Sequence, residues 1–67
     1  MEYLERMKTE LKELNEKIKA LGTFIYSNDL FRSLEEVQRE LMKIQLGYME
    51  EYSDVLTSRI EIEMEME

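Results

Sequence analysis

Two pairs of side chains in this sequence could together bind a flat, anionic molecule. Phe31 directly precedes Arg32, and Tyr3 would meet Arg59 if the two ends of the chain folded back on each other. An aromatic ring can stack on a planar base, and a guanidinium group can hold a phosphate through two parallel hydrogen bonds. The same pairs could instead be cation–π contacts that close the two ends of a small fold. The sequence leaves both interpretations open.

Three further polar or aromatic residues are candidates for ligand contacts. Gln45 lies inside an apolar series, where an amide either sets the register of a helix pair or forms hydrogen bonds with a ligand. Tyr52 is expected at a core or interface position, with its hydroxyl free to form a hydrogen bond. Lys17 offers a cation, although its neighbour Glu13, four residues earlier, would also form a weak surface ion pair with it.

The residue types that are missing exclude most catalytic chemistry. The 67 residues include no histidine and no cysteine, which excludes disulfides, thiolate or imidazole zinc sites and Cys–His or Ser–His nucleophiles. Glu10, Glu13 and Glu16 share a helix face, but a di-metal site in a helical bundle would also need histidines. We therefore expect no enzyme, no metal site and no cofactor.

The charge distribution argues against nucleic-acid polymers as ligands. The net charge is −7, and residues 61–67 alone carry four glutamates and no base. A duplex-binding protein normally presents a basic face, which this sequence lacks. There is also no apolar run long enough to span a membrane and no signal-peptide pattern. We expect a cytoplasmic protein.

Apolar spacing predicts a first helix over residues 3–26. Hydrophobic residues recur every three or four positions, which is the pattern of an a/d seam. They are Leu4, Met7, Leu11, Leu14, Ile18, Leu21 and Ile25. Gly22 could end this helix, but Ile25 keeps the series in phase, so we expect the helix to continue and Gly22 to permit close approach of a partner.

Residues 27–33 are expected to form the corner of an antiparallel hairpin. Ser33 and Glu36 have the spacing of a capping box, which predicts that a second helix starts there. Phe24 and Phe31 flank the corner on either side. They could close the open end of the hairpin with apolar area, or one ring could serve as a stacking platform for a ligand base.

A second helix is predicted over residues 34–60, followed by an acidic tail over residues 61–67 that is frayed or disordered. The inner face of this second helix is predicted to consist of Leu34, Val37, Leu41, Ile44, Tyr48, Tyr52 and either Val55 or Leu56. A second apolar set follows another face of the helix: Met42, Leu46 and Met49. One neighbouring helix cannot cover both sets. The sequence therefore predicts an all-α, coiled-coil-like two-helix hairpin over residues 1–60, which assembles into a symmetric homo-oligomer through the second set.

The stretch KIQLGYMEEYSDVLTSRI, residues 43–60, resembles the small phage hairpin domain shared by anti-CBASS and anti-Thoeris sponge proteins. Over residues 11–60 the order and spacing of residues are also similar to those of small phage proteins related to a crAss-like phage product. The matching residues are Leu14, Lys17, Ile18, Leu21, Phe24, Ile25, Ser27, Asn28, Phe31, Ser33, Leu34, Glu36, Gln38, Leu41, Gln45, Leu46, Met49, Tyr52, Leu56, Arg59 and Ile60.

The resemblance implies a non-enzymatic sponge. Such proteins bind cyclic oligonucleotide or cyclic ADP-ribose-type immune messengers between protomers of a helical oligomer and do not cleave them. On this interpretation, Lys17 is the cation of the first helix that matches the family pattern. The alternative is a helical adaptor that docks a partner protein through its Met and Tyr face, since methionine-rich faces suit adaptable protein contacts.

Overall fold

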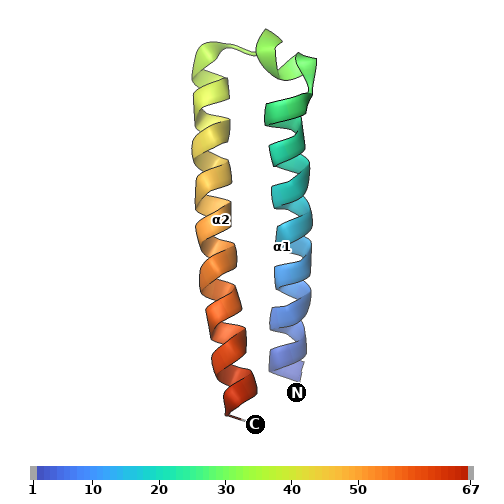
Figure 1. Cartoon of the computed structure of the whole chain (residues 1–67), viewed down its shortest axis with the longest axis vertical. Coiled ribbons are helices and arrows are strands. Elements are labelled where there is room, and N and C mark those ends of the chain that lie inside the picture. Colours follow the sequence, from blue (N-terminus) through green and yellow to red (C-terminus); the bar gives the residue numbers. More distant parts are fainter. Residues whose placement is uncertain (1, 67) are drawn as a thin grey trace.

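The computed structural model of the chain describes residues 2–66 as two long helices that lie side by side (Figure 1). Helix α1 spans Glu2–Ser27, a 3-10 helix η1 spans Asp29–Ser33, and helix α2 spans Glu36–Glu65. The helices are antiparallel, so the start of α1 and the end of α2 lie at the same end of a rod with extents of 49 × 15 × 14 Å. No strand occurs in the described part. The predicted all-α hairpin is confirmed.

Helix α1 is continuous through its single glycine. A Cβ atom on Gly22 would lie 4.0 Å from Leu46 Cδ2, which is an ordinary van der Waals distance. Gly22 therefore faces α2 of the same hairpin across an ordinary contact, and the expected role of this glycine in the close approach of a partner is not supported. Glu2 and Glu5 lie in the first turn of α1, where carboxylates interact favourably with the helix dipole.

Short-range hydrogen bonds build the corner between the helices. The Asn28 side chain caps η1 by accepting a hydrogen bond from the Leu30 amide at 2.8 Å. The Ser33 hydroxyl donates to the Leu30 carbonyl at 2.7 Å, and Ser33 is the last residue of η1 rather than the residue before α2. The N-cap residue of α2 is instead Glu35, which makes no side-chain capping bond. The predicted capping box is therefore wrong.

Arg39 ties the start of α2 to this corner. Its Nη1 atom donates to the carbonyl oxygens of Arg32 and Leu34, two acceptors that neither η1 nor α2 uses. A charged donor on a backbone carbonyl forms a stronger hydrogen bond than a neutral one. This single guanidinium group thus fixes how the chain enters α2.

The apolar contacts between α1 and α2 form two clusters. Leu4, Met7, Leu56 and Ile60 are buried near the chain ends, and Leu11 packs against them. The second cluster lies near the corner and consists of Ile25, Phe31 and Leu46 together with the half-buried Ile18, Leu21, Phe24, Leu34 and Met42. Between the clusters, the Ser53 hydroxyl donates to Asn15 Oδ1 at 2.7 Å. The predicted stripe of α1 is thus its inner face.

The predicted inner face of α2 is wrong for five of its residues, which are exposed: Val37, Leu41, Ile44, Tyr48 and Tyr52. The predicted Leu34 does pack against the corner cluster, and of the two alternatives for the last position Val55 is exposed and Leu56 is buried. Leu56 is fully buried, with 0% of its surface exposed, and Leu46 packs opposite Gly22. Helix α2 carries two apolar stripes of helical period, and packing against α1 selects the one that contains Leu46, Leu56 and Ile60.

The structure also bears on two other expectations for α2, its interface residues and its acidic tail. Leu46 is buried and Met42 and Met49 are half-buried, so these expected interface residues lie on or beside the face that α1 covers. The helix also continues to Glu65, so most of the expected acidic tail is helical rather than frayed, while residue 67 lies outside the described part.

Candidate functional site

The second apolar stripe of α2 forms a continuous exposed surface. Its six members recur every three or four residues and are each 45–69% exposed: Val37, Leu41, Ile44, Tyr48, Tyr52 and Val55. We call this surface the α2 face. At the standard helical rise it is about 27 Å long. Single exposed apolar residues are normal in soluble proteins, but a contiguous apolar surface of this length indicates a binding site.

A groove of about 480 Å³ lies in the middle of the α2 face. It is lined by Leu41, Ile44, Gln45, Tyr48, Met49 and Tyr52. Volumes of this order are typical of small-molecule sites, which are mostly apolar with a few polar groups that orient the ligand. Here the polar groups are the two tyrosine hydroxyls and the Gln45 amide, whose Nε2 lies 3.9 Å from Met49 Sδ. A sulfur acceptor at this distance is weak, so the amide can exchange it for a ligand.

The groove can stack and orient a planar group, but its lining contains no carboxylate and no cation. Two phenol rings provide flat surfaces and one amide provides both donors and an acceptor. The lining contains no histidine, cysteine, serine or lysine either. The chemistry that the groove supports is therefore binding.

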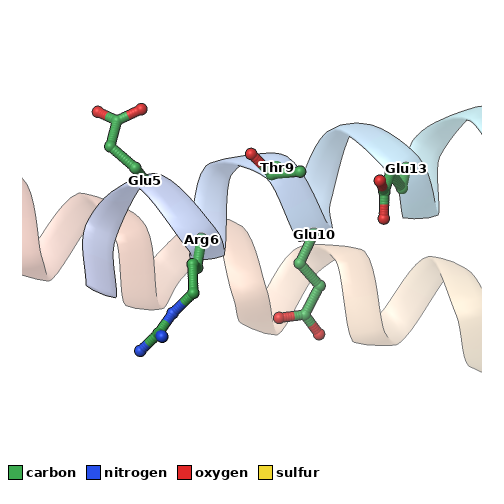
Figure 2. A pocket seen from close by; sticks show the side chains of 5 residues that line it. All are labelled: Glu5, Arg6, Thr9, Glu10 and Glu13. Carbon is green, nitrogen blue, oxygen red and sulfur yellow. The ribbon is translucent and has the colours of Figure 1, made fainter. Parts of the chain in front are cut away.

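A second, smaller depression of about 270 Å³ lies on the surface of α1 (Figure 2). Glu5, Arg6, Thr9, Glu10 and Glu13 line it. In the view of Figure 2, Arg6 and Glu10 point to one side of the helix and Glu5 to the other. Three carboxylates against one guanidinium group disfavour an anion here. Among residues 2–66, no group of three or more possible metal ligands lies together.

The structure brings Tyr3 and Arg59 together at the free end of the hairpin. Arg59 Nη2 donates to the Tyr3 hydroxyl at 2.7 Å, and both side chains are exposed. The pair joins the first turn of α1 to the last third of α2. Because the guanidinium meets the hydroxyl group, the contact is a hydrogen bond at the edge of the phenol.

The two phenylalanines meet at the corner. The Phe24 and Phe31 rings lie 6.0 Å apart in a T-shaped arrangement with an interplanar angle of 89°. Phe31 is buried in the corner cluster, so its ring is used for packing. Arg32 is exposed beside it, and its carbonyl accepts the bond from Arg39. Lys17 is exposed on α1.

Of the eight residues predicted to bind a ligand, only Gln45 and Tyr52 line the groove. Sequence reasoning placed Tyr48, Leu41 and Ile44 on the inner face and so missed their place in the groove. One signal could have located them: two tyrosines one turn apart carry hydroxyls that a two-helix core would leave without partners. That argument favours the exposed side for Tyr48 and Tyr52.

Comparison with known proteins places the chain in a family. The family model named Sequestin matches residues 1–62, which is nearly the whole sequence. The chain belongs to the Sequestin family. No curated protein and no solved structure matches it.

The name Sequestin denotes sequestration, which agrees with a groove built for binding. The match includes both helices and the corner, and therefore every residue of the groove. The family name therefore suggests that this helical protein sequesters a small ligand rather than transforming it. Within the described residues, neither helix is long and apolar enough to cross a membrane.

Proposed function

We propose that this Sequestin is a phage counter-defence sponge that binds a cyclic nucleotide immune messenger and holds it without cleaving it. The messenger would be a cyclic oligonucleotide or a cyclic ADP-ribose-type molecule in the host cytosol. The groove of the α2 face carries the proposal, because it combines two tyrosine rings with one amide on an apolar floor. Stacking of a base on an aromatic side chain contributes about 1–3 kcal/mol.

The mechanism follows from mass action. A sponge that binds one equivalent of messenger tightly keeps the free messenger below the dissociation constant of its receptor. The lining contains no histidine, cysteine, lysine or carboxylate that would catalyse hydrolysis of a phosphodiester, so we expect bound messenger to leave intact.

The phosphates of such a messenger are held most strongly by cations, which the groove of one chain does not supply. We therefore propose that the binding unit is a homo-oligomer, in which basic side chains of a neighbouring copy approach the groove. Lys17, Arg32 and Arg59 are the proposed sources, since all three are exposed and lie outside the groove of their own chain. Symmetry supplies each contact twice, which suits a messenger with two phosphates.

A thermal shift screen against cyclic di- and trinucleotides and cyclic ADP-ribose-type compounds tests the proposal. A ligand at one hundred times its dissociation constant stabilises the folded protein by about 2.7 kcal/mol. Tyr48→Ala and Tyr52→Ala should remove the shift. Tyr26→Ala is the matched control, because Tyr26 is 73% exposed and does not line the groove. A shift that survives both groove substitutions would contradict the assigned site.

The second candidate function is a helical adaptor that docks a partner protein. The length and helical period of the α2 face favour it, because an apolar helical stripe is the usual element that enters a groove on a partner. If no messenger in the panel changes the melting temperature, the adaptor becomes the better explanation.

A further inference from the structure

A methionine lies in the groove beside the amide that is best placed to orient a ligand. Met49 lines the groove and is half-buried, and Gln45 Nε2 donates to its sulfur at 3.9 Å. The two residues are four positions apart, so they occupy successive turns on one side of α2. Because a thioether sulfur is a weak acceptor, the amide can leave it for a ligand. The chemical state of this sulfur therefore decides whether the Gln45 amide is available.

Among the groups that line the groove, the thioether is the one that a peroxide oxidises. The sulfur lone pair attacks one oxygen of hydrogen peroxide, and the O–O bond breaks as the S–O bond forms. After a proton shift, the second peroxide oxygen leaves as water. Sulfur is oxidised by one electron pair and the peroxide is reduced by the same pair. Methionine sulfoxide reductases reverse the change.

Oxidation would remove the properties that suit Met49 to the groove. A flexible apolar side chain becomes a polar one. The sulfoxide oxygen lies one bond beyond the sulfur, carries partial negative charge and accepts a hydrogen bond more strongly than the thioether does. It is therefore placed to hold the Gln45 amide, and it adds a polar group beside Tyr48 and Tyr52, where a base would stack.

The other methionines among residues 2–66 do not share this position. Met7 is only 4% exposed, and Met42 is half-buried in the corner cluster. Met64 and Met66 are 53% and 77% exposed, so a peroxide reaches them, but neither lines the groove. Within the described part of the chain, Met49 is thus the methionine whose oxidation changes the groove.

We propose that Met49 is an oxidation site that switches the groove off, because its sulfoxide oxygen holds the Gln45 amide away from a ligand. Reduction of the sulfoxide restores the groove. The dissociation constant of a bound messenger should rise about tenfold on oxidation, which at 1.4 kcal/mol per factor of ten is the size of one hydrogen bond. The effect on messenger rests on the proposed function, whereas the contact between the sulfoxide and Gln45 does not.

Nuclear magnetic resonance of the glutamine side-chain amides tests that contact without any messenger. The sequence contains two glutamines, and Gln38 is exposed outside the groove, so it serves as the internal control. Peptide mass spectrometry after peroxide treatment shows which methionines have gained an oxygen atom. Oxidation at Met49 should shift the amide proton resonances of Gln45 downfield and leave those of Gln38 unchanged. Unshifted Gln45 resonances in protein oxidised at Met49 would overturn the inference.

Messenger binding before and after peroxide treatment tests the consequence. Met49→Leu keeps an apolar side chain of similar volume that peroxide does not oxidise, so it should bind equally well in both states. Wild type should weaken about tenfold and recover with a methionine sulfoxide reductase. A variant with Met64→Leu and Met66→Leu should behave as wild type does. Equal weakening of wild type and Met49→Leu, or unchanged binding by protein oxidised at Met49, would overturn the inference.

Two controls keep these outcomes separate from unfolding and from failure of the sponge. Oxidation of Met7 or Met42 would disturb the hairpin core, so the series is repeated with Met7→Leu and Met42→Leu in place. Helical circular dichroism of each oxidised sample shows that it is folded. If no messenger binds the untreated protein, the proposed function fails, and the Gln45 resonances alone decide whether oxidation of Met49 captures the amide.

Discussion

Gly47→Ala should stabilise the hairpin. The added methyl group meets open space and α2 keeps its geometry. Alanine favours a helix interior by about 0.5–1 kcal/mol over glycine. For a domain of this size, a gain of that order raises the melting temperature by about 2–8 °C.

The assay is thermal unfolding followed by circular dichroism. Gly22→Ala is the matched control, because its Cβ atom makes only an ordinary contact at 4.0 Å with Leu46. It should also melt higher than wild type.

If Gly47→Ala lowered the melting temperature, the space around Gly47 would not be open and this reasoning would be refuted.

Four further substitutions test the hairpin itself, each measured by urea unfolding of dilute protein. Leu56→Ala should lower the free energy of unfolding by about 2–5 kcal/mol, because Leu56 is fully buried. Val55→Ala, its exposed neighbour, should change it by less than about 0.5 kcal/mol, and equal losses would contradict the assignment of the inner face. Arg39→Ala removes the donor for two corner carbonyls and should cost about 1–2 kcal/mol; no loss would mean that water replaces the guanidinium. Tyr3→Phe deletes the exposed acceptor of Arg59 and should cost under about 1 kcal/mol, and a larger loss would show that this end of the hairpin is better shielded from water than its exposure indicates.

The sequence was sufficient to predict the two helices, the corner and the inner face of α1. That face is predictable because its apolar residues form a single narrow stripe, so only one side of the helix can be buried. The meeting of Tyr3 and Arg59 followed directly from an antiparallel hairpin. In each case a single rule, apolar periodicity for α1 or antiparallel pairing for Tyr3 and Arg59, allowed only one prediction.

The inner face of α2 could not be read in the same way. Two apolar stripes of helical period run along α2, and local periodicity gives no preference between Tyr48 and Leu46. Packing against α1 decides, since Leu46 fits opposite Gly22 and Leu56 fits among Leu4 and Met7. The groove was missed for the same reason, because it lies on the stripe that was expected inside.

The most direct test of sequestration is a depletion measurement. A fixed amount of cyclic dinucleotide or cyclic ADP-ribose-type messenger is mixed with increasing protein, and free messenger is measured by mass spectrometry after ultrafiltration. For at least one messenger, the free concentration should fall linearly to a stoichiometric end point, and heating should return the full amount with unchanged mass. Messenger that stays free at every protein concentration, or returns as a linear product, would contradict the account.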